Sequence, residues 1–184
     1  MVIVKGVVDM NIICRIKDDD IGQKSIKFND SKIRCAAYGI VKNDDKIALI
    51  NVSNRGYYLL PGNIVEDDED YRSSFINNVY KQTGCKINIE KVIGAIEEER
   101  VLSRFKQTSY IFISNVTEFD KKKEYSEDEV FNGTKIEWVN EDKALVMVAM
   151  SYDNLNIDDA EDLYKIKFDV KRSQTILEEY IKSK

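Results

Sequence analysis

The stretch YYLLPGNIVEDDEDYRSSFINNVYKQTGCK, residues 57–86, decides the fold of this chain. Its residue types predict the end of a strand, a tight turn, an acidic loop and a helix, which cover 57–60, Pro61-Gly62, 66–70 and the residues up to Gly84. The Asp70 side chain can accept hydrogen bonds from the unpaired amides of the first helical turn. Gly84 tolerates the left-handed conformation that ends a helix.

The predicted helix has two faces of opposite character. Tyr71, Phe75 and Val79 recur every four residues, with Ile76 beside them, so one stripe is apolar and must be buried. The other stripe is polar and consists of Asn77, Asn78, Lys81 and Gln82. Most polar stripes of this kind are solvated helix faces without a further role, and that interpretation stays open here.

The order of strand, Pro-Gly turn, acidic loop, helix and Gly-Cys resembles the Nudix box. That box is the signature G-x5-E-x7-R-E-U-x-E-E-x-G-U, with U a bulky apolar residue, of hydrolases that act on nucleoside diphosphates linked to another group. With its closing Gly on Gly84, Glu69 takes the first Glu and Val79 the apolar position. The remaining positions carry Asn63 at the first Gly, Asn77 at the Arg, Asn78, Lys81 and Gln82 at three Glu, and Cys85 at the last apolar place.

In that family the three Glu share divalent cations, because residues three and four apart on a helix emerge on one patch. The cations would polarise the pyrophosphate and activate a water. Asn78, Lys81 and Gln82 remove about four units of negative charge, and each unit about 4 Å from a divalent ion is worth roughly 8 kcal/mol before desolvation. The Lys81 ammonium repels a metal and attracts a phosphate. We therefore expect no metal cofactor.

Three hypotheses follow from the resemblance. In the first, which the charge argument favours, a catalytically impaired or inactive Nudix-fold protein binds a nucleotide or nucleoside diphosphate derivative. In the second, a divergent pyrophosphohydrolase of nucleoside diphosphates linked to another group uses Mg²⁺ or Mn²⁺ held by relocated carboxylates. These would be Glu66, Glu69 and the acidic segment 97–99, with Glu69 and Glu98 as the catalytic residues. The third is a homodimeric scaffold built on the terminal helix and edge strands.

The family layout also suggests residues that bind the ligand. Arg34 and Arg55 would lie on the pocket side and could hold a phosphate through their rigid fork of donors. Glu66 and Lys81 belong to the same expected ligand site. Tyr58 takes a place where the family often has Trp, so it either stacks on a base or packs in the core, and core packing is favoured.

Composition limits the function further. The chain has 184 residues, enough for one domain with a real core, and a formal net charge of -5. The acidic balance argues against general affinity for nucleic acid or anionic membranes, and no apolar run approaches the ~20 residues of a membrane span. We expect a cytoplasmic protein whose partner is a small nucleotide-like molecule.

Histidine and cysteine usage narrows the chemistry. The chain has no histidine, which removes the usual general base. Cys14, Cys35 and Cys85 lack the spacing of metal ligands and are predicted to be buried free thiols. Catalysis, if present, would rest on carboxylates, lysines or tyrosines.

Patterns outside the box fit the same layout. Residues 1–30 are predicted to add a hairpin at the sheet edge or to form an arm, and 158–184 look like the closing helix of a bacterial Nudix subgroup, capped by Asp158 or Asp159. Between them we expect strands at 33–41, 46–52, 87–96, 108–116 and 135–139, an acidic turn at 97–100, a charged loop at 118–129 and a helix from about 141 to 150. We predict one α+β domain over residues 1–184 with the Nudix fold, a mixed β-sheet sandwiched between helices (α/β/α).

Overall fold

The computed structural model describes residues 10–24, 31–120, 123 and 125–184. In this part of the chain, eight strands form one mixed sheet in the order β1-β6-β7-β2-β3-β4, with β5 paired to β2 and β8 paired to β3. The strands are β1 Ile12–Ile16, β2 Lys32–Asn43, β3 Lys46–Val52, β4 Tyr57–Leu59, β5 Gly62–Val65, β6 Cys85–Arg100, β7 Phe105–Phe119 and β8 Thr134–Asn140. The helices are α1 Tyr71–Thr83, α2 Glu127–Phe131, α3 Glu141–Asn154 and α4 Ala160–Lys182, with short 3-10 turns η1 Asp18–Ile21 and η2 Ser53–Arg55.

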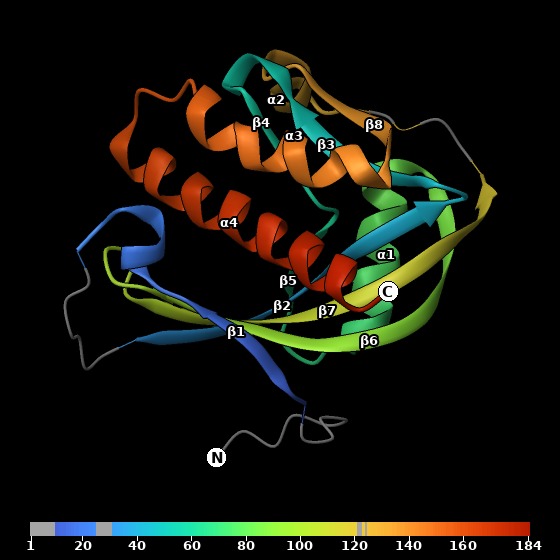
Figure 1. Cartoon of the computed structure of the whole chain (residues 1–184), viewed down its shortest axis with the longest axis horizontal. Coiled ribbons are helices and arrows are strands. Elements are labelled where there is room, and N and C mark those ends of the chain that lie inside the picture. Colours follow the sequence, from blue (N-terminus) through green and yellow to red (C-terminus); the bar gives the residue numbers. More distant parts are fainter. Residues whose placement is uncertain (1–9, 25–30, 121–122, 124) are drawn as a thin grey trace.

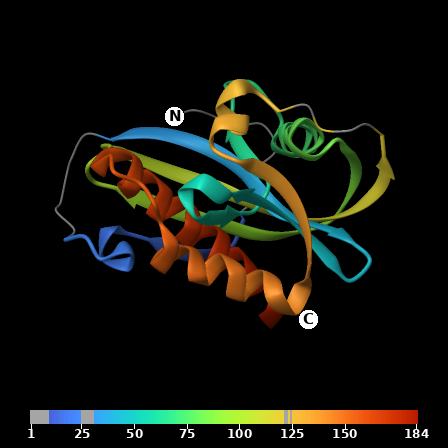
Figure 2. The ribbon, with the colours of Figure 1, turned by 90° about the horizontal axis from the view of Figure 1, so that it is seen from above.

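Helices cover both faces of the sheet. α1 lies on one face, and α3 and α4 lie side by side on the other (Figure 1, Figure 2). Two separate groups of buried apolar residues match these layers. One includes Phe75 of α1, and the other includes Val148 of α3 and Phe168 of α4. The predicted α+β architecture, a mixed sheet between helices, is confirmed.

The box helix α1 has the ends that the sequence predicts. The Asp70 side chain accepts a hydrogen bond from the Ser73 amide at 2.9 Å, and Gly84 closes the helix with φ 74°. Phe75 and Val79 on its apolar stripe are fully buried, as expected, whereas Ile76 keeps 36% of its surface exposed. The local sequence signals therefore determine where this helix begins, where it ends and which face it buries.

A close approach between α1 and the sheet explains one glycine. The ring of Phe75 stacks on Phe112 of β7, with 4.9 Å between the ring centroids. A Cβ on Gly39 of β2 would lie 2.2 Å from the Phe112 carbonyl oxygen and 2.9 Å from the Phe75 ring. Gly39 therefore leaves the space that lets α1 pack directly on the centre of the sheet.

Three segments differ from the sequence prediction. Residues 97–100 are not an acidic turn, because they continue β6 and pair with β7 as far as Arg100 opposite Phe105. Gly62, expected in a turn, begins a short strand that pairs with β2 and runs to Val65, over residues for which no element was predicted. The predicted charged loop at 118–129 begins inside β7 and ends inside α2.

The N-terminal segment is described in part. Ile12–Ile16 form β1, which runs parallel to β6 at the edge of the sheet. This part of the predicted extension therefore adds an edge strand. Residues 1–9 and 25–30 of the predicted extension lie outside the described residues.

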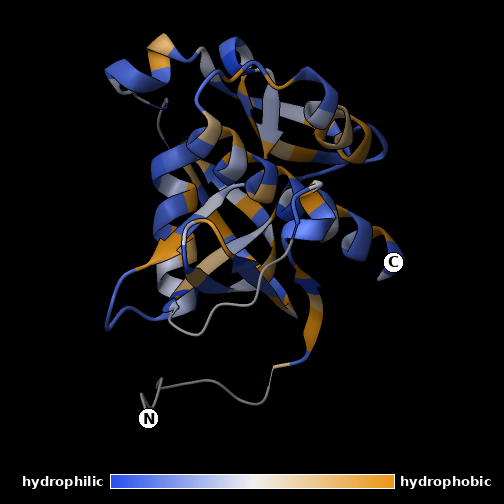
Figure 3. Cartoon of the chain, turned by 90° about the vertical axis from the view of Figure 1, so that its left-hand side faces the viewer, coloured by the Kyte–Doolittle hydropathy of each residue, from blue (hydrophilic) through white to orange (hydrophobic). Residues whose placement is uncertain are grey.

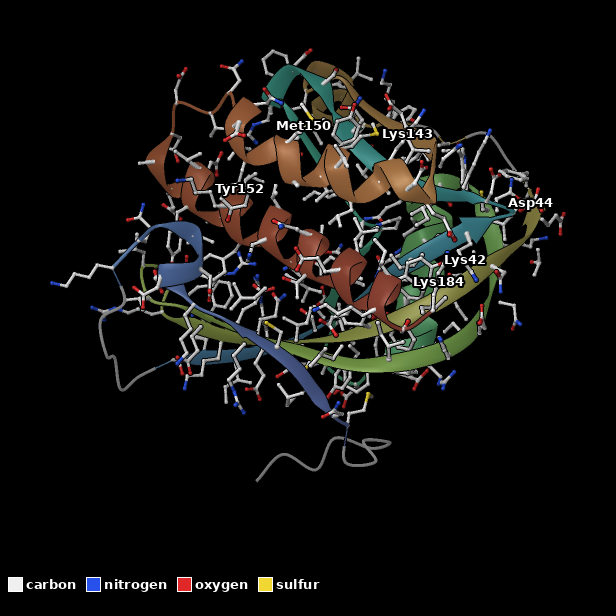
Figure 4. The ribbon with its side chains drawn as sticks, in the orientation of Figure 1. Lys42, Asp44, Lys143, Met150, Tyr152 and Lys184 are labelled. Atoms are coloured by element: carbon white, nitrogen blue, oxygen red, sulfur yellow. The ribbon has the colours of Figure 1, made fainter. Side chains whose placement is uncertain are left out.

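The C-terminal helices pack on each other and on the sheet. α4 begins at its predicted cap, since the Asp159 side chain accepts from the Asp162 amide at 2.8 Å. α3 is longer than predicted and ends at Asn154. Tyr152 of α3 lies against α4 and donates its hydroxyl proton to the Lys167 carbonyl oxygen at 3.0 Å (Figure 4).

The outward faces of the helices are mostly polar. Figure 3 shows hydrophilic residues along much of the helices, interrupted by hydrophobic bands, and hydrophobic segments on several strands. Within the described part of the chain, no helix combines the length and the apolarity needed to cross a bilayer. The three cysteines are free, as predicted, but only Cys85 is fully buried, and Cys14 and Cys35 are half-buried.

We expect Asp70→Ala to lower the free energy of unfolding by about 1 kcal/mol, because the Ser73 amide then loses its side-chain acceptor. Urea denaturation followed by circular dichroism measures the change. Asp67→Ala on the exposed loop before the helix is the control and should stay within about 0.5 kcal/mol of the unchanged protein. Equal losses in the two variants would contradict the capping role.

Candidate functional site

The polar face of α1 carries no carboxylate at the three box positions. Asn77 and Lys81 are exposed, whereas Asn78 and Gln82 are half-buried. The Asn78 amide donates to the hydroxyl of Ser74, one turn earlier, at 3.3 Å. Lys81 forms no ion pair with another described residue. This face therefore presents amides and an ammonium to solvent.

Gln82 is engaged with the backbone of the Pro61-Gly62 turn. Its Nε2 donates to the Gly62 carbonyl oxygen at 3.0 Å, and its Oε1 accepts from the Gly62 N–H at 3.0 Å. Each bond of this kind contributes about 0.5–1.5 kcal/mol net. The amide oxygen of Gln82 is thus already in use as an acceptor, and the pair joins α1 to Gly62, the first residue of β5.

The acidic loop before α1 holds the carboxylates closest to it in sequence. Glu66 and Glu69 are both exposed, and the Glu69 N–H donates to the Glu66 carbonyl oxygen at 3.2 Å in a turn. Among the residues that the structure describes, no three histidine, cysteine, aspartate or glutamate side chains are grouped so as to hold a metal ion. With Lys81 on the helix, the residues at the box positions do not fit the metal cluster of the Nudix pattern.

Glu98 lies elsewhere, on the face of the sheet that α4 covers. Its side chain is completely buried and forms ion pairs with two guanidinium groups. Arg100 of the same strand lies 2.6 Å from one carboxylate oxygen, and Arg172 of α4 lies 2.7 Å from the other. The structure therefore brings Glu98 to two arginines, whereas Glu66 and Glu69 belong to the loop that leads to the opposite face.

Asp169 of α4, with 25% of its side chain exposed, lies at the border of this cluster, which consists of Glu98, Arg100, Asp169 and Arg172 and is called the buried ionic cluster below. Its Oδ1 lies 2.8 Å from Arg100 and 3.0 Å from Arg172. Burial alone would raise the pKa of Asp169, but the two guanidinium groups outweigh it and hold that pKa below its ordinary value. Asp169 is therefore ionised in the folded protein at neutral pH. Lowering the pH through the pKa that Asp169 has in the folded protein protonates it and removes the stability that its ion pairs contribute at neutral pH.

Arg34 borders the buried ionic cluster but has a different role. Its Nε donates to the Gln107 side-chain oxygen at 2.6 Å, and its guanidinium lies 3.9 Å from the centre of the Phe105 ring. No carboxylate of a described residue lies within ion-pair distance of it. Burial and then the nearby charge of Arg100 lower the pKa of Arg34. An anion that reached Arg34 would relieve this repulsion.

Arg55 and Tyr58 already contact other residues of the chain. Arg55 of η2 lies 3.1 Å from the Asp162 carboxylate of α4. Tyr58 is half-buried and packs against the core on the α3 and α4 side. Its hydroxyl accepts from the Asn51 amide at 3.2 Å. These contacts fit a structural role, and their part in ligand binding stays a prediction.

Sequence reasoning missed Arg100, Asp169 and Arg172. A signal for them exists in their spacing. Residues 98 and 100 share one face of a strand, and residues 169 and 172 share one face of a helix. Four consecutive charged residues at 97–100 favour a solvated turn, and this pattern hides the alternation that places residues 98 and 100 on one face of a strand.

We expect Glu98→Gln to lower the free energy of unfolding by about 3 kcal/mol or more, because it leaves two buried guanidinium groups short of a negative partner. Urea denaturation measures the loss. Glu99→Gln is the matched control, since its partner Lys106 is half-exposed and such a pair is worth about 1 kcal/mol at most. Similar losses in both variants would show that the buried ionic cluster contributes no more to stability than an exposed ion pair does.

Comparison with curated proteins gives a partial match. No protein-family model matches the chain. Two mouse (Mus musculus) proteins, diphosphoinositol polyphosphate phosphohydrolases 3-alpha and 3-beta, are each 27% identical to it over 105 residues. The aligned part is 56% of this chain and 60% of the length of each of these relatives.

Solved structures match over more of the chain. A NUDIX hydrolase from Nitrosomonas europaea has a TM-score of 0.53 at 17% identity, covering 77% of this chain and 89% of that one. A NUDIX family hydrolase from Clostridium perfringens has a TM-score of 0.50 at 13% identity, covering 78% of this chain and 95% of that one. At such identities the likeness shows the fold, which is the one that the stretch 57–86 predicts.

Proposed function

We propose, from the premise that this chain has the Nudix fold, that it binds a nucleotide or nucleoside diphosphate derivative without a metal ion and hydrolyses it poorly or not at all. The observation that carries this proposal is the chemistry of the three box positions on α1. Asn78 offers a neutral amide there, the Gln82 amide is paired with Gly62, and Lys81 offers a positive charge. A phosphate suits such a surface, and a hard divalent cation does not.

The contacts of these residues strengthen the case against a metal. A cation at the Gln82 oxygen would have to share this oxygen with the hydrogen bond from the Gly62 N–H. The same cation would lie near the Lys81 ammonium, which repels it. No negative charge at these positions offsets the cost of stripping water from the ion.

The class of ligand is supported by the positive groups and by the relatives. Lys81 on α1 and Arg34 beside Phe105 are cations without a carboxylate partner among the described residues, but they lie on opposite faces of the sheet and do not form one site. The mouse relatives are named for diphosphoinositol polyphosphates, which are small molecules rich in phosphate. For this chain we propose only the shared chemistry, a phosphorylated small molecule whose negative charge these groups attract.

The alternative is a divergent hydrolase that uses Mg²⁺ or Mn²⁺ on relocated carboxylates. The carboxylates expected to hold the ion differ in burial and in ion pairing. Glu98 is buried and forms ion pairs with two arginines, whereas Glu66 and Glu69 are exposed. The acidic loop therefore has carboxylates that could reach an ion without breaking a buried pair, and so do Glu97 and Glu99, whose pairs with Arg15 and Lys106 are exposed. The cytoplasmic location and the homodimer stay predictions.

We expect magnesium and manganese to bind no more tightly than millimolar and to support no release of phosphate from a panel of nucleoside diphosphate derivatives. Isothermal titration and a phosphate assay provide the measurements. Metal-dependent turnover that Glu69→Gln abolishes would refute the proposal and establish the alternative.

A companion experiment restores Asn77→Arg, Asn78→Glu, Lys81→Glu and Gln82→Glu together. Hydrolysis by this variant would show that the chain lacks only the metal ligands. No hydrolysis, with the variant folded, would show that the substrate site has changed as well.

We expect Lys81→Ala to weaken the binding of inorganic pyrophosphate in EDTA by about 5- to 10-fold, since one charge-assisted contact of this size corresponds to about 1–1.4 kcal/mol. Lys143→Ala is the matched control, because Lys143 is also an exposed helical lysine but belongs to α3 (Figure 4). Equal affinities of both variants would place the phosphate away from α1.

A further inference from the structure

The Gln82 side chain pairs with both polar groups of one glycine. Its Nε2 donates to the Gly62 carbonyl oxygen and its Oε1 accepts from the Gly62 N–H, both at 3.0 Å. Gly62 is buried, so neither group can turn to water instead. At neutral pH a primary amide supplies a donor and an acceptor side by side, whereas an ionised carboxylate supplies acceptors only, so glutamine satisfies both polar groups of this glycine.

The turn that Gln82 contacts is also pressed against the sheet. The Pro61 carbonyl oxygen accepts from the Gly39 N–H of β2 at 3.1 Å. A Cβ on Gly62, where φ is 142°, would lie 2.3 Å from the Ala37 carbonyl oxygen of the same strand. The Pro61-Gly62 turn is therefore held between β2 on one side and Gln82 of α1 on the other.

We propose that Gln82 is a positioning residue that ties the Pro61-Gly62 turn to α1 without a cation, and that a carboxylate at this position would make the same tie depend on a divalent cation. The second half follows from the pairing. A glutamate could accept from the Gly62 N–H, but it has no proton to offer the Gly62 carbonyl oxygen. Two oxygens would then face each other, and a cation between them would find two hard ligands.

This role of Gln82 extends the function proposed above. It rests on that function in one respect, namely that no resident metal occupies the box. It adds that the lost cation has a replacement in the amide group of Gln82. The turn keeps its place whether or not ions are present in solution.

The test compares melting temperatures of the full chain in EDTA and in millimolar Mg²⁺ or Ca²⁺, with NaCl matched for ionic strength. In EDTA we expect Gln82→Glu to melt about 4 °C or more below the unchanged protein. The divalent ions should restore most of this loss, and NaCl should not. The unchanged protein should melt at the same temperature in all three solutions.

Two further variants separate the pairing from general effects of charge and side-chain loss. Gln82→Met removes both hydrogen bonds and should lose stability without any response to divalent ions. Asn77→Asp makes the same change of charge at an exposed position of α1 and should show neither the loss nor the recovery.

Two outcomes would overturn the tie: Gln82→Glu as stable as the unchanged protein in EDTA, or an equal response of Asn77→Asp to divalent ions. Should the variants fail to fold, hydrogen exchange of the Gly62 amide in the unchanged protein decides. Slow exchange supports the tie, and exchange as fast as in the loop at 66–70 refutes it. Metal-dependent hydrolysis by the unchanged protein would refute the proposed function, whereas the EDTA comparison addresses the tie alone.

Discussion

A carboxylate without water around it requires positive partners, and Glu98 obtains them from its own strand and from α4. Arg172 and Asp169 lie on one face of α4, so the need to meet Glu98 and Arg100 determines which face turns toward the sheet. It also determines how far along the sheet the helix sits. A register shift of one residue would bury guanidinium groups without partners, and this cost excludes neighbouring arrangements that apolar packing alone would allow.

The two faces of the sheet are therefore held by different forces. Under α1 the contact is apolar, with Phe75 stacked on Phe112 over Gly39, and apolar packing tolerates small shifts of the helix. The two hydrogen bonds between Gln82 and Gly62 fix the position of α1 more narrowly than packing does, because hydrogen bonds are specific in distance and angle. Under α4 the buried ionic cluster plays this part. Each helical layer thus combines an apolar contact with one polar constraint.

Local signals in the sequence predict what depends on neighbouring residues. The Asp70 cap, the Gly84 end and the apolar stripe of α1 are all confirmed, as is the sheet sandwiched between helices. What depends on distant partners is missed. Glu98 meets Arg172 across 74 residues, and Gln82 meets Gly62 across 20, so the sequence shows the charge or the amide without its partner. The roles suggested by resemblance for residues such as Arg34 depend on a ligand, which neither the sequence nor the fold specifies.

The residues in and beside the box follow the same division. Gly62, Asp70 and Gly84 serve the backbone, through a close approach, a cap and a left-handed end, and these needs exist with or without a reaction. Exposed positions such as Lys81 do not support the backbone in this way, so the fold does not constrain which residue type stands there. Position 82 is different, because its side chain also supports the Gly62 peptide. A glutamate left there without a cation would leave a buried carbonyl oxygen unpaired, at a cost of about 1–3 kcal/mol. Glutamine removes that cost, because its amide satisfies both polar groups of Gly62 without a bound cation.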